Sequence, residues 1–171
     1  MRYYEFMREN KIEEVFLDDT YSDPGINLEK YSKDPKHKLL QNDNGYYYFE
    51  DDSDDKFINI IVFHNDVCIA VMNTTTYETP FPMIYGTKTS DEYQRQGIMS
   101  KCFDLFVKNH GSLYSDSKQS TSASNMWKKY LSNTSFKKYI YNLNTKIKTP
   151  YDGNINSIWN DDTNTLIGVE K

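Results

Sequence analysis

The chain has 171 residues and a mass of 20.2 kDa, so we expect a single domain over residues 1–171, because one hydrophobic core usually serves a chain of this length. Aromatic residues make up 15% of the sequence and offset a mean hydropathy of −0.80, which favours a folded chain over a disordered one. The formal net charge of −5 argues against nucleic acid as a partner, since such binding depends on a basic surface.

The variable N-terminal part, residues 1–50, has only weak patterns. Four apolar residues at helical spacing predict a first buried stripe: Phe6, Ile12, Val15 and Phe16. A turn is expected at Asp23-Pro24-Gly25, and a second helix in the thirties. From Gln41 to Asp55, the tyrosine-rich run after Gly45 predicts a short strand that ends in a solvated acidic loop.

Two runs of β-branched and aromatic residues, 57–63 and 67–72, have the clearest strand pattern. Three turn-forming residues, 64–66, separate them, so we expect an antiparallel hairpin with much of both faces buried. A further strand is expected over residues 83–89, because Pro80 and Pro82 would break a helix before it.

The hydrophobic period then becomes helical. One broad apolar face predicts a helix of about three turns: Ile98, Cys102, Leu105 and Phe106. Gly111 is well placed to end this helix. A short strand is expected at 112–116, and a second helix, which contains Trp127, should start between Ser120 and Ser124.

The C-terminal part, residues 132–171, predicts further strands. They are expected at 139–141, 155–159 and 166–169, with the last two paired as a hairpin. Strands followed by a strand-turn-helix unit and more strands predict an α+β fold.

Several other classes of protein are excluded by composition. The two cysteines, Cys68 and Cys102, both lie in apolar segments, and the three histidines are far apart, so neither a disulfide framework nor a metal site is expected. The N-terminus lacks the apolar core of a secretory signal, and no apolar run approaches the ~20 residues of a membrane span. We therefore expect a cytoplasmic protein with no metal and no membrane partner.

Gly97 lies between the strand 83–89 and the first turn of the helix that follows. A glycine there costs helix stability unless something needs to approach the backbone closely. A phosphate group would supply that need, because helix N-termini present unpaired N–H groups and a partial positive charge. Arg95 would add a cation and Ser100 a hydroxyl. A second explanation is that Gly97 only lets the helix approach the strand.

At these residues the sequence resembles the GNAT superfamily of N-acetyltransferases, whose acyl-CoA loop has the pattern Q/R-x-x-G-x-G/A. The run from Gln94 to Met99 supplies the first Gln and the first Gly, with Met99 where Gly or Ala is usual. The resemblance covers residues 57–131 best. It implies a GNAT-like α+β fold, with a mixed, mostly antiparallel central sheet flanked by helices.

The resemblance also implies a function, namely transfer of an acetyl group from acetyl-CoA to an amine on a small molecule or protein. It assigns the acyl-CoA contacts to eleven residues: Thr87, Thr89, Gln94, Arg95, Gln96, Gly97, Ile98, Met99, Ser100, Ser120 and Asn125. Glu92 is the candidate base, with Glu78 and Asp91 as alternatives. The resemblance leaves the identity of the amine acceptor open.

The sequence differs from the family at the position whose side chain protonates the leaving thiolate. Trp127 stands where the family has Tyr, and an indole N–H cannot donate a proton at neutral pH. Tyr130, nearly one turn later, is the candidate acid instead. Two alternatives therefore stay open. One is a degenerate GNAT-like protein, such as a virus-encoded one, that binds or inhibits without catalysis, and the other is an unrelated α+β interaction domain.

Overall fold

The computed structural model describes residues 28–54, 56–117, 119–154 and 164–171. These residues form one mixed sheet with the order β1-β2-β3-β4-β5-β6-β9-β7-β8. Its strands are β1 (His37–Asp43), β2 (Tyr46–Asp54), β3 (Phe57–His64), β4 (Val67–Thr75), β5 (Met83–Thr89), β6 (Ser112–Tyr114), β7 (Lys137–Asn142), β8 (Ile147–Pro150) and β9 (Thr165–Glu170). Every neighbouring pair is antiparallel except β5 and β6. The predicted α+β class with a mostly antiparallel sheet is confirmed.

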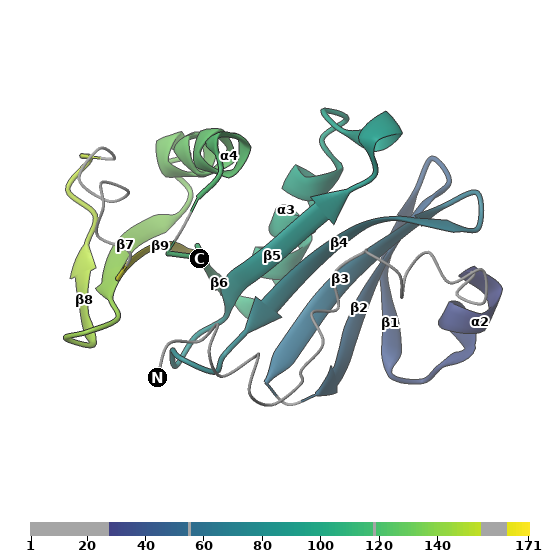
Figure 1. Cartoon of the computed structure of the whole chain (residues 1–171), viewed down its shortest axis with the longest axis horizontal. Coiled ribbons are helices and arrows are strands. Elements are labelled where there is room, and N and C mark those ends of the chain that lie inside the picture. Colours follow the sequence, from purple (N-terminus) through teal and green to yellow (C-terminus); the bar gives the residue numbers. More distant parts are fainter. Residues whose placement is uncertain (1–27, 55, 118, 155–163) are drawn as a thin grey trace.

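The helices of the described chain are α2 (Leu28–Lys33), η1 (Asp91–Tyr93), α3 (Ile98–His110) and α4 (Thr121–Ser132). Helix α3 crosses one face of the sheet behind β4 and β5, and α2 lies at the far edge beside β1 (Figure 1). The apolar faces of α3 and α4 and one face of the strands form the larger core, which includes Ile60, Met72, Phe103, Phe106 and Trp127. Tyr31 of α2 belongs to a smaller core on the β2–β4 strands with Phe49 and Phe63.

Most of the elements expected between residues 57 and 131 are observed. The β3–β4 hairpin turns through Asn65 and Asp66, both with positive φ. Gly111 ends α3 in the left-handed region. Ser120 caps α4, because its hydroxyl accepts a hydrogen bond from the Ala123 N–H at 3.2 Å. The predicted stripe and turn of residues 6–25 and the predicted strand 155–159 lie outside the described residues.

The prediction for residues 41–55 is wrong. In place of one strand and a solvated acidic loop, β1 and β2 form a hairpin through Asn44 and Gly45, whose φ angles are 52° and 81°. An Asn-Gly pair favours this two-residue turn because both positions need positive φ. The acidic run continues the strand, and the Glu50 side chain is buried. Strand β8 was also not predicted; it pairs with β7.

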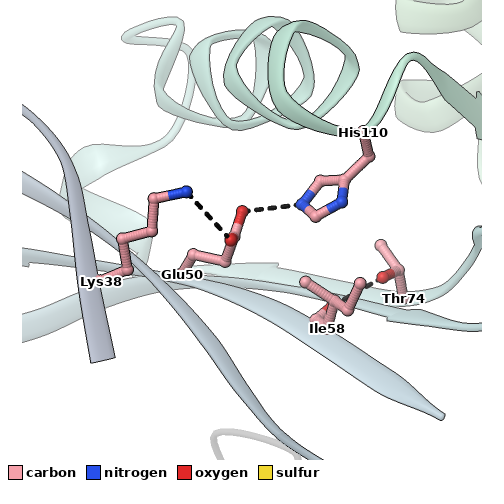
Figure 2. A network of polar contacts seen from close by, with 5 residues as sticks. All are labelled: Lys38, Glu50, Ile58, Thr74 and His110. Carbon is pink, nitrogen blue, oxygen red and sulfur yellow. Dashed lines mark hydrogen bonds and ion pairs between the residues drawn. The ribbon is translucent and has the colours of Figure 1, made fainter. Parts of the chain in front are cut away.

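Glu50 is tolerated in the buried part of the sheet because its carboxylate lies between a lysine and a histidine (Figure 2). One carboxylate oxygen is 2.7 Å from His110 Nε2, and the other is 3.7 Å from Lys38 Nζ. His110 is the last residue of α3, where the helix dipole favours a cation. The hydrogen bond to His110 is the main cause that lowers the pKa of Glu50 from its ordinary 4.5. The pair therefore ties the end of α3 to β2.

We expect Glu50→Gln to lower the free energy of unfolding at pH 7 by about 1–3 kcal/mol, because a hydrogen bond to a buried charge is lost. The native-state pKa is lowered, so this stabilisation is complete above the unfolded-state value and is lost as the pH falls through the native one. Urea unfolding from pH 7 to pH 3 should show wild type and variant converge. Glu29→Gln, which breaks an exposed pair with Lys33, is the control and should change stability by less than ~0.5 kcal/mol. A constant difference across this pH range would contradict the role of Glu50.

Candidate functional site

Strands β5 and β6 separate immediately after they meet. Their register contains one residue pair, Met83 with Tyr114, and the Tyr114 N–H donates to the Pro82 carbonyl at 2.9 Å. On its other edge, β5 pairs with β4 from Met83 to Thr89. No strand of the described chain pairs with the β6-facing edge of β5 beyond Met83.

The backbone of β5 presents hydrogen-bonding groups at this open edge. The Ser90 N–H bonds to the Ile69 carbonyl of β4 at 2.9 Å. Because successive residues of a strand direct their N–H and C=O groups to opposite edges, those of Thr87 and Thr89 point away from β4. The Thr89 carbonyl accepts from Gln94 Nε2 at 3.3 Å, which agrees with this direction. An extended ligand could therefore pair with β5 as a strand does.

A β-bulge interrupts β5 near its middle. Asn73 pairs with Gly86 and Thr74 with Ile84, so the register between β4 and β5 skips Tyr85. Bulges bend a strand and are frequent beside functional sites. Here the bulge lies where β5 leaves β6.

The loop after β5 brings helix α3 to the same opening. Arg95 and Gly97 have φ angles of 63° and 81°, so both bend the chain through the left-handed region, at a cost of about 1 kcal/mol for a residue with a Cβ such as Arg95. The first α3 hydrogen bond runs from the Lys101 N–H to the Gly97 carbonyl at 3.0 Å. The N–H groups of the three residues between them, 98–100, therefore have no partner within the helix, and they suit an anion.

A pocket of about 450 Å³ joins the open edge of β5 to the start of α3. It is lined by Thr87, Lys88, Thr89, Tyr93, Gln94, Arg95, Gly97, Ile98, Met99, Ser100, Ser120, Ser122, Ala123 and Met126. A second pocket of about 200 Å³ adjoins it on the side of the bulge and shares Thr87, Ser120, Ala123 and Met126. We call the first the large groove and the second the small pocket.

The large groove contains nine of the eleven residues predicted to bind acyl-CoA, all except Gln96 and Asn125. The Gln96 side chain does not line the groove; its Nε2 donates to the Glu92 carbonyl at 2.9 Å. Asn125 is on the exposed side of α4. The predicted base Glu92 is exposed and lines neither pocket. Gln96 was chosen because it lies within the motif of residues 94–99, and Glu92 because it lies close to the loop in sequence.

The predicted acid Tyr130 is also outside both pockets. Its hydroxyl lies 2.8 Å from the Ser100 carbonyl and 2.9 Å from Asp104 Oδ1, and the side chain is 5% exposed. Burial and the Asp104 carboxylate raise the pKa of Tyr130 far above its ordinary value, which makes the phenol a weaker acid. These contacts give Tyr130 a structural role between α3 and α4.

Sequence reasoning missed the aromatic side chains that support the loop. Tyr46 and His64 stack with ring centroids 4.4 Å apart, and His64 Nδ1 is 3.1 Å from the Tyr93 hydroxyl. The Tyr46 hydroxyl donates to Gln96 Oε1 at 3.2 Å. Tyr46, His64 and Tyr93, which we call the aromatic bracket, connect the turns of two hairpins to the loop. His64 was interpreted as an ordinary turn residue, because its partners are 18 and 29 positions away in the sequence.

No protein-family profile and no curated protein matches the sequence. Three solved structures have a similar fold. An Escherichia coli ribosomal-protein alanine N-acetyltransferase is 17% identical, with 68% of each chain covered and a TM-score of 0.36. A Paenibacillus lautus diaminobutyrate acetyltransferase, in complex with its substrate and coenzyme A, is 16% identical, with 70% of this chain and 72% of that chain covered and a TM-score of 0.43.

The third structure is a putative acetyltransferase of the GNAT family from Bacteroides thetaiotaomicron. It is 13% identical, with 68% of this chain and 62% of that chain covered and a TM-score of 0.41. These similarities concern the fold alone.

Two further findings concern the described residues only. They contain no group of three His, Cys, Asp or Glu side chains that could hold a metal ion. They also contain no helix with the length and apolar character needed to cross a membrane.

We expect His64→Ala to loosen the loop, because it removes the stack with Tyr46 and the contact with Tyr93. Hydrogen exchange should become faster at residues 92–97 than in the core strands β3 and β4. Val67→Ala, which changes the exposed residue paired with His64, is the matched control and should leave exchange in the loop unchanged. Equal protection of residues 92–97 in wild type and His64→Ala would show that the aromatic bracket does not hold the loop.

We expect Tyr130→Phe to lower the free energy of unfolding by about 1–2 kcal/mol, because the hydroxyl of the buried Tyr130 side chain no longer donates to the Asp104 carboxylate and the Ser100 carbonyl. The same variant should bind acetyl-CoA as wild type does, measured by thermal stabilisation. If an acetyl-CoA-dependent turnover is lost while stability is retained, the structural role is insufficient and Tyr130 acts as the acid after all.

Proposed function

We propose that this chain binds acetyl-CoA in the large groove and transfers its acetyl group to an amine. The observation that carries the proposal is the meeting of two backbone features in one groove: an unpaired strand edge on β5 and the uncapped N-terminus of α3. The first suits the amide-containing pantetheine arm, and the second suits the pyrophosphate. The resemblance of residues 94–99 to an acyl-CoA loop supports the same ligand.

The pyrophosphate would lie on the loop and on the first turn of α3. The N–H groups of residues 98–100 would donate to it, and two cationic side chains, Lys88 and Arg95, line the same groove. The space beside Gly97 is open to a ligand: apart from the residues next to it in the chain, no atom of the described residues lies within 4 Å of the position that a Cβ would take. A volume of about 450 Å³ lies within the range of pockets that hold small-molecule ligands.

The pantetheine amides would pair with Thr87 and Thr89 along β5, which directs the thioester toward the bulge at Tyr85. There the amine nitrogen attacks the thioester carbonyl carbon, the C–S bond breaks, and the acetyl group passes to nitrogen. The nitrogen loses a proton and the departing thiolate gains one. N–H groups at the bulged edge would stabilise the oxyanion, which is the electrostatic contribution that acyl transfer requires.

Binding without transfer is the second candidate function, and Trp127 favours it. This side chain is 1% exposed, packs edge-on against Phe103 with ring centroids 5.2 Å apart, and also lines the small pocket. It stands where the family places its proton donor, and an indole cannot supply that proton. Release of free thiol from acetyl-CoA in the presence of amines separates an enzyme from a binding protein.

We expect acetyl-CoA and CoA to stabilise the wild-type chain, by about 2.7 kcal/mol at one hundred times the dissociation constant. Gly97→Glu should abolish this stabilisation, because it places a carboxylate where the pyrophosphate binds. Gly111→Glu is the matched control: Gly111 has a φ of 80°, and the position of a Cβ there is likewise open, with no atom of the described residues within 4 Å apart from the neighbours in the chain. Both variants pay the same strain of a left-handed residue, about 1–2 kcal/mol, and they lie at opposite ends of α3.

Differential scanning fluorimetry of the three proteins with and without millimolar ligand tests this prediction. Stabilisation of wild type and Gly111→Glu, with none for Gly97→Glu, is the expected pattern. A wild-type chain that shows no shift would overturn the proposed function. Equal shifts in all three proteins would place the ligand elsewhere on the molecule.

A further inference from the structure

The carboxylate of Asp116 lies next to the open edge of β5. The sequence pattern had not indicated this residue. Among the described residues that line the two pockets, Asp116 is the one acidic side chain. It lines the small pocket together with Tyr85 and Gly86 of the bulge. The alternatives suggested by sequence proximity, Glu92 among them, line neither pocket.

The position of Asp116 is fixed by the strand that leads to it. Ser115, which is fully buried, donates its N–H to the Ile167 carbonyl at 2.7 Å and accepts from the Ile167 N–H through its hydroxyl at 3.0 Å. The Gln119 side chain donates to the Asp116 carbonyl at 2.8 Å. Asp116 Oδ1 also accepts from the Ser117 N–H. The carboxylate is therefore held at the end of β6, where β6 has left β5.

The remaining wall of the small pocket is mainly apolar. Ile84, Met126, Ala123 and the buried Trp127 line it, and Tyr85 and Gln119 add polar atoms. At about 200 Å³ the pocket is smaller than the ~300 Å³ at which pockets begin to enclose whole drug-sized ligands. It suits the amine-bearing end of a substrate with an apolar stem.

Building on the proposed function, we infer that Asp116 binds the ammonium group of the acceptor and removes its proton. The acceptor is a primary amine on an unbranched apolar stem, which enters the small pocket while acetyl-CoA lies in the large groove. The ammonium transfers one proton to the Asp116 carboxylate and becomes a nucleophile. The nitrogen then attacks the thioester carbon, the C–S bond breaks, and the second proton lost by nitrogen balances the proton gained by the thiolate.

The charge of the whole chain agrees with a cationic acceptor. The formal net charge of −5 attracts cations at long range and increases their rate of encounter with the pocket.

Asp116→Asn tests the inference with little change of shape, since the amide oxygen can still accept from the Ser117 N–H. We expect this variant to keep the thermal stabilisation by acetyl-CoA and to lose about 100-fold or more in kcat/KM for n-butylamine, the range that general base catalysis covers. Asp116→Glu should recover part of the loss. Asp43→Asn, the same change at an exposed end of β1 outside both pockets, is the matched control and should behave as wild type.

Thiol release with n-butylamine, which is an ammonium at neutral pH, is compared with release with aniline, which is not. Wild type should prefer n-butylamine, and Asp116→Asn should lose that preference. A wild-type enzyme whose Asp116→Asn variant retains both turnover and preference would overturn the role of Asp116 and leave the proposed function intact. A wild-type chain with neither acetyl-CoA binding nor thiol release would instead remove the proposed function, and with it this inference.

Discussion

The separation of β5 from β6 depends on strong pairing of each strand with its other neighbour. Strand β5 pairs with β4 over its whole length, whereas β6 pairs with β9. The β6–β9 pair is locked by Tyr114, which is fully buried and stacks on Phe81 with ring centroids 3.8 Å apart, and whose hydroxyl donates to Glu170 at 2.7 Å. A Cβ at Gly168 would meet the Tyr114 ring at 2.3 Å, so only glycine admits this ring. Neither strand can close the gap without breaking such contacts.

Helix α3 packs on one face of the sheet against β4 and β5 on one side of the gap and against β6 on the other. Its two ends make different contacts. Its N-terminus leaves backbone N–H groups at the groove, while its C-terminus holds His110 against Glu50 of β2. Between them, the fully buried side chains of Cys102, Phe103 and Phe106 pack in the larger core. This packing lets the N-terminal turn remain uncapped, because the stability of the helix comes from its apolar face. The exposed donors at the groove therefore do not weaken the fold.

The sequence predicted the parts of the molecule that depend on local patterns. Nearly continuous apolar runs located β3 and β4, two prolines excluded a helix before β5, a helical hydrophobic period located α3, and a glycine at an uncommon place located the loop. Glu50 was misjudged because its burial depends on His110, sixty residues away in the chain. The contacts of Tyr130 could not be predicted for the same reason, since helical spacing places it on α4 but does not reveal that its hydroxyl bonds to Asp104 and Ser100. Asp116 follows a three-residue strand, and only the divergence of β5 and β6 gives it a pocket.

The aromatic bracket connects strands β2 and β3 to the large groove through side-chain contacts. Tyr46 begins β2 and His64 ends β3, and these two residues pair in the register of the sheet. Tyr93, which His64 contacts, lines the large groove. The left-handed Arg95 lies between Tyr93 and Gly97, so its strained conformation is held from both sides: by the bracket at Tyr93 and Gln96, and by the start of α3 at Gly97. Strain of this kind persists only where surrounding contacts determine the backbone. The hairpin turns of β1–β2 and β3–β4 therefore belong to the groove as much as the loop does, although neither turn lines it.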